Sequence, residues 1–170
     1  MEETIFTKYI DSPLGELEIS ATEDYLTSIL FVDAQKKPSP RKVETEYVPT
    51  VITDYVRQIA EYFEGTRKDF DLKIQHKGTD FQKTVWAELE NIPFGKTISY
   101  LELSRRIGNE KAIRAVGTTN GSNKFNIIVP CHRVIGANGS LVGYGGDLWR
   151  KKWLLEHEAK VLGNYQTSLF

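Results

Sequence analysis

Short segments in which hydrophobic and polar residues alternate dominate the first third of the chain. Residues 4–10, 17–21 and 26–32 each show the two-residue period of a half-buried strand, and turn-forming residues separate them at 11–15 and 23–24. Strands joined by such short turns usually pair with their neighbours in the chain. This part of the sequence therefore predicts a three-stranded antiparallel meander.

A helical period replaces the strand pattern after a predicted loop at residues 36–41, which contains two prolines and no hydrophobic residue. Between residues 53 and 63 the hydrophobic residues recur at the spacing of one helix face, and Gly65 stands where a C-cap glycine is expected. We expect this helix to cover one face of the meander. A short strand is also predicted at residues 70–74.

The remainder of the chain is predicted to be mostly helical. One helix should run from residue 80 to residue 90, with Thr79 or Asp80 as its N-cap and a hydrophobic stripe made of Phe81, Val85, Trp86 and Leu89. Asp147 is the predicted N-cap of the last helix, over residues 148–160. The hydrophobic stripe of that helix should consist of Trp149, Trp153 and Leu154.

Two short helices joined by a Gly-Asn turn are predicted between them. Ser99 caps the first, over residues 100–107, Gly108 ends it, and Asn109 caps the second, over residues 110–118. This arrangement is typical of a helix-turn-helix, although similar helical hairpins occur in proteins that never bind DNA. In the second helix, small residues surround the long side chain of Arg114, and this composition suits close approach to a DNA groove. A solvated surface arginine is the alternative.

These elements predict an α+β fold with two domains: a small N-terminal antiparallel-sheet domain at residues 1–77 and a mostly helical domain with a helix-turn-helix at residues 78–170. The composition, with 40% hydrophobic and 26% charged residues in 170, is that of a globular protein. No hydrophobic stretch approaches the roughly 18 residues that span a bilayer, and no signal peptide is evident. We expect a cytoplasmic protein without a membrane partner.

Charge is divided unevenly along the chain. The formal net charge is −1, but residues 1–79 contain 10 Lys and Arg against 15 Asp and Glu, a sum of −5, whereas residues 80–170 contain 12 against 8, a sum of +4. Electrostatic attraction depends on the local potential, not on the sum over the molecule. The second region is therefore compatible with a surface for a polyanion.

Cys131 is the only cysteine in the chain. An intramolecular disulfide needs a pair of cysteines and a structural zinc site needs three or four soft ligands, so a chemical role is the main use left for this sulfur. An adjacent imidazole raises the thiolate fraction of a cysteine, and His132 is its neighbour in sequence. The alternative is inert packing, which is common for free cysteines.

The surroundings of Cys131 predict an accessible position. Residues 126–129 have the β-branched character of a buried strand, Pro130 ends that strand, and turn-forming residues follow at 135–140. A nucleophile just past the end of a strand would lie at an open rim.

Three separated motifs closely resemble the O6-alkylguanine-DNA alkyltransferases: residues 115–117 (AVG), 130–134 (PCHRV) and 153–158 (WLLEHE). Their order and spacing also agree with that family, over residues 78–158, which is about half the chain. The resemblance implies a ribonuclease-H-like N-terminal domain. It also implies repair of O6-alkylguanine in DNA, and O4-alkylthymine is left open as a second substrate.

The resemblance implies a methylated-DNA--[protein]-cysteine S-methyltransferase that acts once, with Cys131 as the alkyl acceptor. His132, through a bridging water, and Glu158 would draw the thiol proton away, and Asn123 would hold the local turn. The hydroxyl of Tyr100 would reach N3 of the flipped guanine and stabilise the leaving base. Each residue also has a purely structural alternative. His132 would be a packed core side chain, Glu158 a solvated charge on a helix, and Tyr100 a half-buried aromatic ring.

The same resemblance implies double-stranded DNA as the partner, bound through the minor groove with the alkylated guanine flipped out. Arg114 would occupy the space that the flipped nucleotide leaves. Ala112, Ala115 and Gly117 would allow the helix to approach closely. We expect a monomer, and cooperative binding along DNA is left open.

Pocket positions of the family correspond to Val134, Tyr144 and Gly145. Some relatives have serine at the last of these positions, so glycine predicts a roomier pocket. Asp147 stands where many relatives have glycine and places a carboxylate near the lip of the pocket. The cysteine and histidine set that binds zinc in some members is missing, and we expect neither a metal nor a cofactor.

Two other functions remain open from the residues. A DNA-damage clamp, as in alkyltransferase-like proteins, would bind and flip the lesion without removing it, but those relatives lack the reactive cysteine. A cysteine hydrolase could use Cys131 and His132, yet no oxyanion-hole motif is evident.

Overall fold

The computed structural model describes residues 3–34, 40–141 and 147–163. The chain divides into two compact units, Met1–His76 and Lys77–Phe170. The domain boundary expected after residue 77 stays a prediction. Within the described residues, no helix has both the length and the hydrophobicity needed to cross a membrane.

The first unit contains a three-stranded antiparallel sheet in the order β1-β2-β3, as predicted. The strands are β1 (Phe6–Ile10), β2 (Leu17–Ala21) and β3 (Leu26–Phe31), and the central strand is buried along its whole length. The turn between β1 and β2 is closed by the Ser12 hydroxyl, which donates to the Gly15 carbonyl at 2.6 Å. The meander is thus built from the local turn chemistry that the sequence contains.

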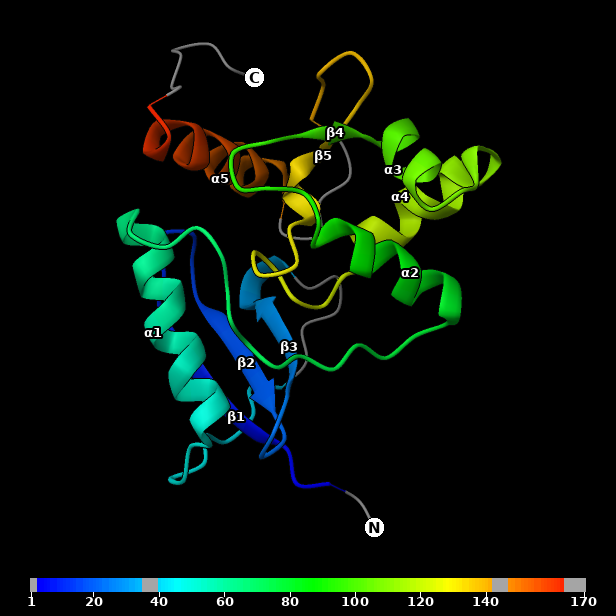
Figure 1. Cartoon of the computed structure of the whole chain (residues 1–170). Helices are drawn as coiled ribbons and strands as arrows, with labels where there is room; N and C mark the ends of the chain where they lie inside the picture. Colours follow the sequence, from blue (N-terminus) through cyan, green and yellow to red (C-terminus); the bar gives the residue numbers. More distant parts are fainter. Residues whose placement is uncertain (1–2, 35–39, 142–146, 164–170) are drawn as a thin grey trace. The chain divides into compact units, whose positions relative to one another are not determined.

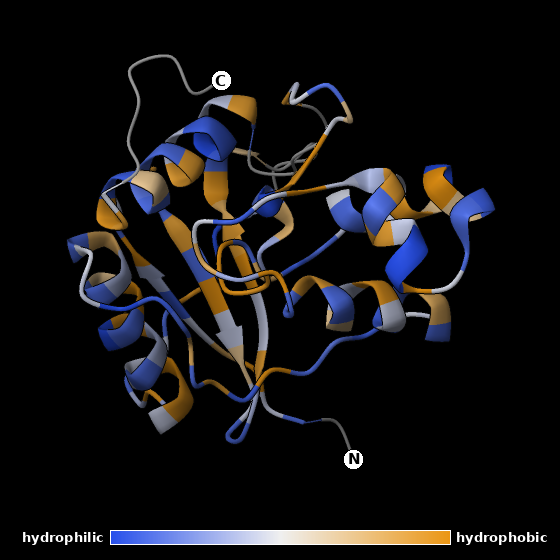
Figure 2. Cartoon of the chain, turned by 45° about the horizontal axis from the view of Figure 1, so that its top comes forward, coloured by the Kyte–Doolittle hydropathy of each residue, from blue (hydrophilic) through white to orange (hydrophobic). Residues whose placement is uncertain are grey.

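Helix α1 (Thr50–Glu64) packs beside this sheet, as Figure 1 shows. It begins three residues before the predicted start, directly after Pro49. Gly65 ends it at a φ of 86°, in the left-handed region that glycine adopts without strain. The hydropathy colours of Figure 2 alternate around this helix, and its buried residues include Ile52, Tyr55, Ile59 and Tyr62.

The strand predicted at residues 70–74 is wrong. Ile74 forms only an isolated parallel bridge with Leu26. The Leu26 N–H donates to the Lys73 carbonyl, and the Gln75 N–H donates to the Leu26 carbonyl, both at 2.9 Å. The segment therefore touches β3 at one point instead of adding a strand to the sheet. The predicted loop at 36–41 falls largely outside the described residues.

The second unit begins with α2 (Asp80–Leu89), whose N-cap is Thr79. The Thr79 hydroxyl accepts from the Gln82 N–H at 3.1 Å, and the Gln82 side chain accepts from the Thr79 N–H at 2.9 Å. This reciprocal pair is a capping box. Val85, Trp86 and Leu89 of the predicted stripe are buried, whereas Phe81 is only partly covered.

The helix-turn-helix consists of α3 (Tyr100–Arg106) and α4 (Ile113–Gly121). Ser99 caps α3 as predicted, and Gly108 makes the turn with a φ of 78°. The cap expected at Asn109 is wrong, because its side chain makes no capping hydrogen bond. A 3-10 turn at Glu110–Ala112 comes first, and α4 therefore starts and ends about one turn later than predicted.

The strand predicted at residues 126–129 is also wrong, although these residues are buried. Ile127 has a φ of 75°, which a β-strand excludes. The real strands nearby are short: β4 (Ile98–Ser99) pairs in parallel with β5 (Val134–Ile135). This pair brings the start of α3 beside the segment that follows Cys131.

Helix α5 (Leu148–Val161) begins where predicted and ends one residue later, but its buried face is not the predicted one. Trp149 is 53% exposed, whereas three charged residues of this helix, Arg150, Lys151 and Glu158, are buried together with Leu154. Asp147 precedes the helix without making a side-chain cap, and its carboxylate lies 3.4 Å from a guanidinium nitrogen of Arg150 instead. The charged side of α5 therefore faces the interior of its unit.

Removing the capping hydroxyl of α2 should destabilise the second unit. We expect Thr79→Ala to lower the free energy of unfolding by about 1 kcal/mol, because the Gln82 N–H at the start of the helix loses its acceptor. The control is Thr84→Ala on the same helix, where the hydroxyl only bonds back to the Asp80 carbonyl. Alanine is the better helix former there, so the control should not be destabilised. Urea unfolding measures both; equal losses would contradict the capping role.

Candidate active site

Cys131 opens a 3-10 turn (Cys131–Arg133) between Pro130 and β5. The Asn123 amide organises this region: its Nδ2 donates to the carbonyls of Phe125 at 3.2 Å and Val129 at 3.0 Å, and it lies 3.5 Å from Sγ of Cys131. Its Oδ1 accepts from the Phe125 N–H at 3.0 Å. One buried side chain thus supplies the hydrogen bonds that a strand partner would have given, which explains why residues 126–129 coil.

The sulfur is not at an open rim, as the sequence led us to expect, since Cys131 is only 2% exposed. Residues 125–134 are all buried, so the sulfur lies in the interior of its unit. Burial raises the pKa of the Cys131 thiol, while the Asn123 hydrogen bond and the positive charge of Lys151 act in the opposite direction. The resting site therefore favours the thiol.

His132 and Glu158 meet inside the unit, although 26 residues separate them in the chain. Nε2 of His132 lies 2.7 Å from Oε2 of Glu158, and both side chains are fully buried. The structure thus brings together two of the residues that the sequence singled out. It also shows that they belong to different elements, the turn after Pro130 and helix α5.

Arg133 completes this cluster, and sequence reasoning missed it. Its Nε donates to Oε1 of Glu158 at 2.9 Å and its Nη2 to Oε2 at 3.1 Å, while Nη1 donates to the Ile92 carbonyl at 2.7 Å. The Gly95 N–H adds a fourth donor to the same carboxylate at 2.9 Å. The only sequence signal for Arg133 was its place inside the 130–134 motif.

The surroundings of Glu158 fix the protonation of His132. Burial alone would raise the pKa of Glu158, but the charges and hydrogen bonds of His132 and Arg133 outweigh it and hold the pKa far below its usual range. The carboxylate is therefore ionised and accepts a hydrogen bond from Nε2–H of His132. Burial also lowers the pKa of His132, against the opposing influence of Glu158, so the imidazole is neutral at neutral pH.

Nδ1 of His132 is consequently the basic nitrogen of the ring. It is buried and has no hydrogen-bond partner among the residues that the structure describes. A neutral imidazole with its other nitrogen tied to a carboxylate is the arrangement that general-base catalysis uses.

Tyr100 is half-buried at the first position of α3. Burial and the nearby Cys131 raise the pKa of its phenol, so the hydroxyl stays protonated and can donate. Val134, on β5, is fully buried next to the turn that bears Cys131. Tyr144 and Gly145 lie outside the described residues.

The residues expected to contact DNA lie on α4 and the turn before it. Arg114 and Ala115 are exposed, Ala112 is partly exposed, and Val116 is buried as the inward anchor of the helix. Nε1 of Trp86 on α2 donates to the Thr119 carbonyl at 3.0 Å and so fixes α4 from behind. Gly117 differs from the rest, because a Cβ on it would lie 3.9 Å from the Tyr100 ring.

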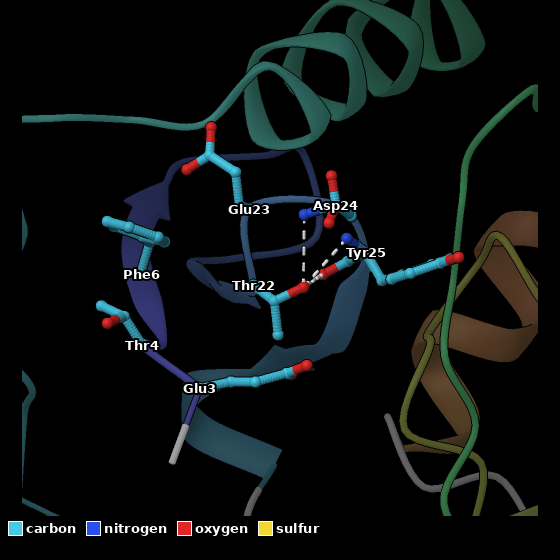
Figure 3. Close-up of a pocket in the computed structure, with 7 residues that line it drawn as sticks. All are labelled: Glu3, Thr4, Phe6, Thr22, Glu23, Asp24 and Tyr25. Carbon is cyan, nitrogen blue, oxygen red and sulfur yellow. Dashed lines mark hydrogen bonds between the residues drawn. The ribbon is translucent and has the colours of Figure 1, made fainter. Parts of the chain in front are cut away.

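A cavity in the first unit, shown in Figure 3, contains none of these residues. It is lined by Glu3, Thr4, Phe6, Thr22, Glu23, Asp24 and Tyr25. The Thr22 hydroxyl accepts from the N–H groups of Asp24 and Tyr25 and so closes the turn between β2 and β3. Among residues 3–34, 40–141 and 147–163, no cluster of three His, Cys, Asp or Glu side chains suits a metal ion. The expected absence of a metal stays a prediction.

The fold and the site together define a class of protein: an α+β protein whose helical unit sets a single buried cysteine beside a carboxylate-oriented histidine, next to a helix-turn-helix.

The chain belongs to the 6-O-methylguanine DNA methyltransferase family. The DNA binding domain of that family matches residues 80–160, and its ribonuclease-like domain matches residues 5–76. The chain is similar to the methylated-DNA--protein-cysteine methyltransferase of Mycolicibacterium paratuberculosis, with 44% identity over 151 residues that cover 89% of this chain and 90% of the relative. The constitutive enzyme of that name from Bacillus subtilis is 43% identical over 141 residues, which cover 81% and 84%.

Solved structures give the same result. The O6-methylguanine methyltransferase of Mycobacterium tuberculosis superimposes with a TM-score of 0.83 at 40% identity and covers 98% of both chains. The crystal structure of Mycobacterium tuberculosis OGT in complex with DNA has a TM-score of 0.83 at 43% identity and covers 92% of this chain and 94% of that one.

Neutralising Glu158 should strongly destabilise the second unit. We expect Glu158→Gln to lower the free energy of unfolding by about 3–5 kcal/mol, because Arg133 would remain buried without its counter-charge. The control is Glu156→Gln on the same helix, whose carboxylate is partly exposed and 3.9 Å from Lys152. The control should change stability by less than about 1 kcal/mol. Urea unfolding at neutral pH measures both.

The pH dependence of stability gives a second readout of the same change. The pKa of Glu158 is lowered on folding, so its contribution is complete above the unfolded pKa of glutamate and is lost as the pH falls toward the folded value. The lowered pKa of His132 adds to this loss as the pH falls below the unfolded pKa of histidine. Glu158→Gln should flatten the acid limb; an acid limb as steep as in the parent protein would contradict the assignment.

Proposed function

We propose that this protein repairs DNA by transferring the alkyl group of O6-alkylguanine to Sγ of Cys131, once per molecule. The supporting observation is the arrangement around the only cysteine: a neutral His132 follows it, its Nε2 is tied to an ionised Glu158, and its Nδ1 is unpaired among the described residues. The similarity to methylated-DNA--protein-cysteine methyltransferases supports the same reaction.

The reaction begins when the thiol proton leaves Sγ for Nδ1 of His132 through a bridging water. Glu158 stabilises the resulting imidazolium and keeps its own negative charge, because its pKa is far too low for it to accept the proton. The thiolate attacks the alkyl carbon and forms the C–S bond as the C–O6 bond breaks. The electron pair of the broken bond remains on the guanine.

Tyr100 stabilises this leaving group by donating its hydroxyl proton toward N3 of guanine. The imidazolium returns its proton to the tyrosine through water, so the net result moves one proton from Cys131 to guanine. The product is a neutral thioether, and no group of the site can break its C–S bond. The protein is therefore spent after one transfer.

DNA binding is assigned to the exposed face of α4. Arg114 fills the space of the flipped nucleotide, and Ala112, Ala115 and Gly117 allow the helix to enter the minor groove. The charge of +4 over residues 80–170 supports binding of the phosphate backbone on this unit. Val134 lines the pocket, with Tyr144 and Gly145 proposed beside it. We place the activity inside the cell, where DNA is the substrate and the thiol stays reduced.

Mass spectrometry of the whole protein tests the transfer directly. After incubation with a duplex containing O6-methylguanine, we expect one methyl group on Cys131 and a yield that saturates at one per protein. Cys131→Ser should bind the same duplex without forming an adduct, because the docking helix is separate from the sulfur. Binding without an adduct in the parent protein would indicate a damage clamp, and continued turnover would indicate a hydrolase.

Arg114→Ala should separate nucleotide flipping from chemistry. Flipping costs a few kcal/mol, so the loss of the inserted side chain should slow repair of duplex DNA by roughly tenfold or more. Reaction with free O6-benzylguanine, which needs no flipping, should change less than twofold by the same reasoning. Arg57→Ala on α1, at a side chain that is 57% exposed, is the charge-matched control. Equal slowing with both substrates would show that Arg114 acts on the chemical step.

A further inference from the structure

Lys151 is a buried cation that the reaction above leaves unused. It lies on the inward face of α5 with 0% of its surface exposed. Its Nζ donates to the Val134 carbonyl at 2.5 Å and lies 5.8 Å from the centre of the Tyr100 ring. A lysine without solvent access is rare unless a negative or polarisable partner stabilises it.

The buried carboxylate of the same helix, Glu158, is already paired with another cation. Glu158 forms two hydrogen bonds with the Arg133 guanidinium, so their charges cancel within the buried cluster. Arg150, the other buried cation of α5, lies beside the Asp147 carboxylate. Lys151 interacts with titratable groups of two other elements, Tyr100 on α3 and the Cys131 and His132 side chains of the turn after Pro130.

Lys151 and Cys131 influence each other's ionisation. Burial lowers the pKa of Lys151 to about 8, and the negative charge of an ionised Cys131 raises it. Burial raises the pKa of Cys131, and the positive charge of Lys151 lowers it. The two groups therefore stabilise each other only as the pair of thiolate and ammonium, since the attraction needs both charges.

We propose that Lys151 is a positioning residue for alkyl transfer: anchored on the Val134 carbonyl and beside the Tyr100 ring, its ammonium is the counter-charge of the Cys131 thiolate. The inference rests on the proposed function, because it takes the thiolate as the nucleophile. Lys151 keeps its own proton throughout. The thiol proton goes to His132, and the negative charge moves from sulfur to guanine as the C–O6 bond breaks.

Kinetics with free O6-benzylguanine test this role without any contribution from DNA binding. Lys151→Met keeps the length and hydrophobic stem of the side chain and removes the charge. At neutral pH we expect transfer at least about tenfold slower than in the parent protein, the loss that one pKa unit in the thiol produces. The ratio of the parent rate to the Lys151→Met rate should fall toward one above the pKa of Lys151, about 8, because the parent protein then loses the same charge.

Two variants make the comparison specific. Lys152→Met is the control, because this neighbouring side chain is 50% exposed and its removal changes the net charge equally. Lys151→Arg should retain most of the neutral-pH rate, since arginine keeps the charge at every accessible pH. A rate loss in Lys151→Met that is the same at all pH values would overturn the proposal and leave Lys151 as a structural tie to β5.

Titration of the thiol decides the question even if the protein transfers no alkyl group. Cys131 is the only cysteine, so protein labelled with ¹³Cβ-cysteine gives a single NMR signal to follow with pH. The pKa of Cys131 should be lower in Lys151→Arg than in Lys151→Met by about one unit or more. Equal midpoints in the two folded variants would refute the inference, whereas absence of transfer in the parent protein with different midpoints would refute only the proposed function.

Discussion

The Glu158 carboxylate holds the catalytic unit together. It accepts hydrogen bonds from the ring of His132, from two nitrogens of Arg133 and from the Gly95 N–H, so one side chain joins α5, the turn after Pro130 and the loop after α2. A buried carboxylate without such donors would cost several kcal/mol. The three segments must therefore reach their positions together. The orientation of His132 and the nitrogen that carries its proton both follow from this one contact.

The interior of the second unit is organised as pairs of opposite charge. Arg133 balances Glu158, and Lys151 is the proposed counter-charge of the Cys131 thiolate. This arrangement explains why α5 exposes Trp149 and buries Arg150, Lys151 and Glu158. A helix that only packed would do the reverse. Because replacing buried ions with hydrophobic residues often leaves a protein equally stable, these charges are more readily understood through the chemistry of the site than through stability.

Sequence patterns predicted the elements that depend on local chemistry. The caps at Thr79 and Ser99 and the glycines at positions 65 and 108 act within one turn of themselves, and the strands of the meander follow from a two-residue period. Residues 126–129 were mistaken for a strand because their hydrophobic character is real, while the cause of their coiled path is the amide of Asn123, a side chain outside the segment. A period in hydrophobicity contains no information about such a contact.

The candidate site likewise contains some residues that the sequence made evident and others that only the fold reveals. Cys131 and His132 are neighbours in sequence and were evident from their chemistry, whereas Glu158 was indicated only by a resemblance, since 26 residues separate it from the ring it contacts. Arg133 was marked only by its place in the 130–134 motif and Lys151 by nothing, because a surface cation and a buried one look alike in a sequence. Their roles depend on which carboxylate or thiol the fold brings near, and that is set by tertiary structure.

Burial of the sulfur suits a reaction that consumes the protein. An exposed thiolate reacts with any available oxidant or alkylating agent, and each such event would remove one molecule from use. In this structure burial raises the pKa of Cys131, so the resting group is a thiol. Asn123 and Lys151 act in the opposite direction and stabilise the thiolate, and His132 is placed in the proposed reaction to take the proton. The same enclosure that protects the sulfur keeps bulk solvent away from it, and electrostatic stabilisation is strongest in such surroundings. Protection and reactivity thus arise from one feature, a nucleophile held inside the protein beside the groups that ionise it.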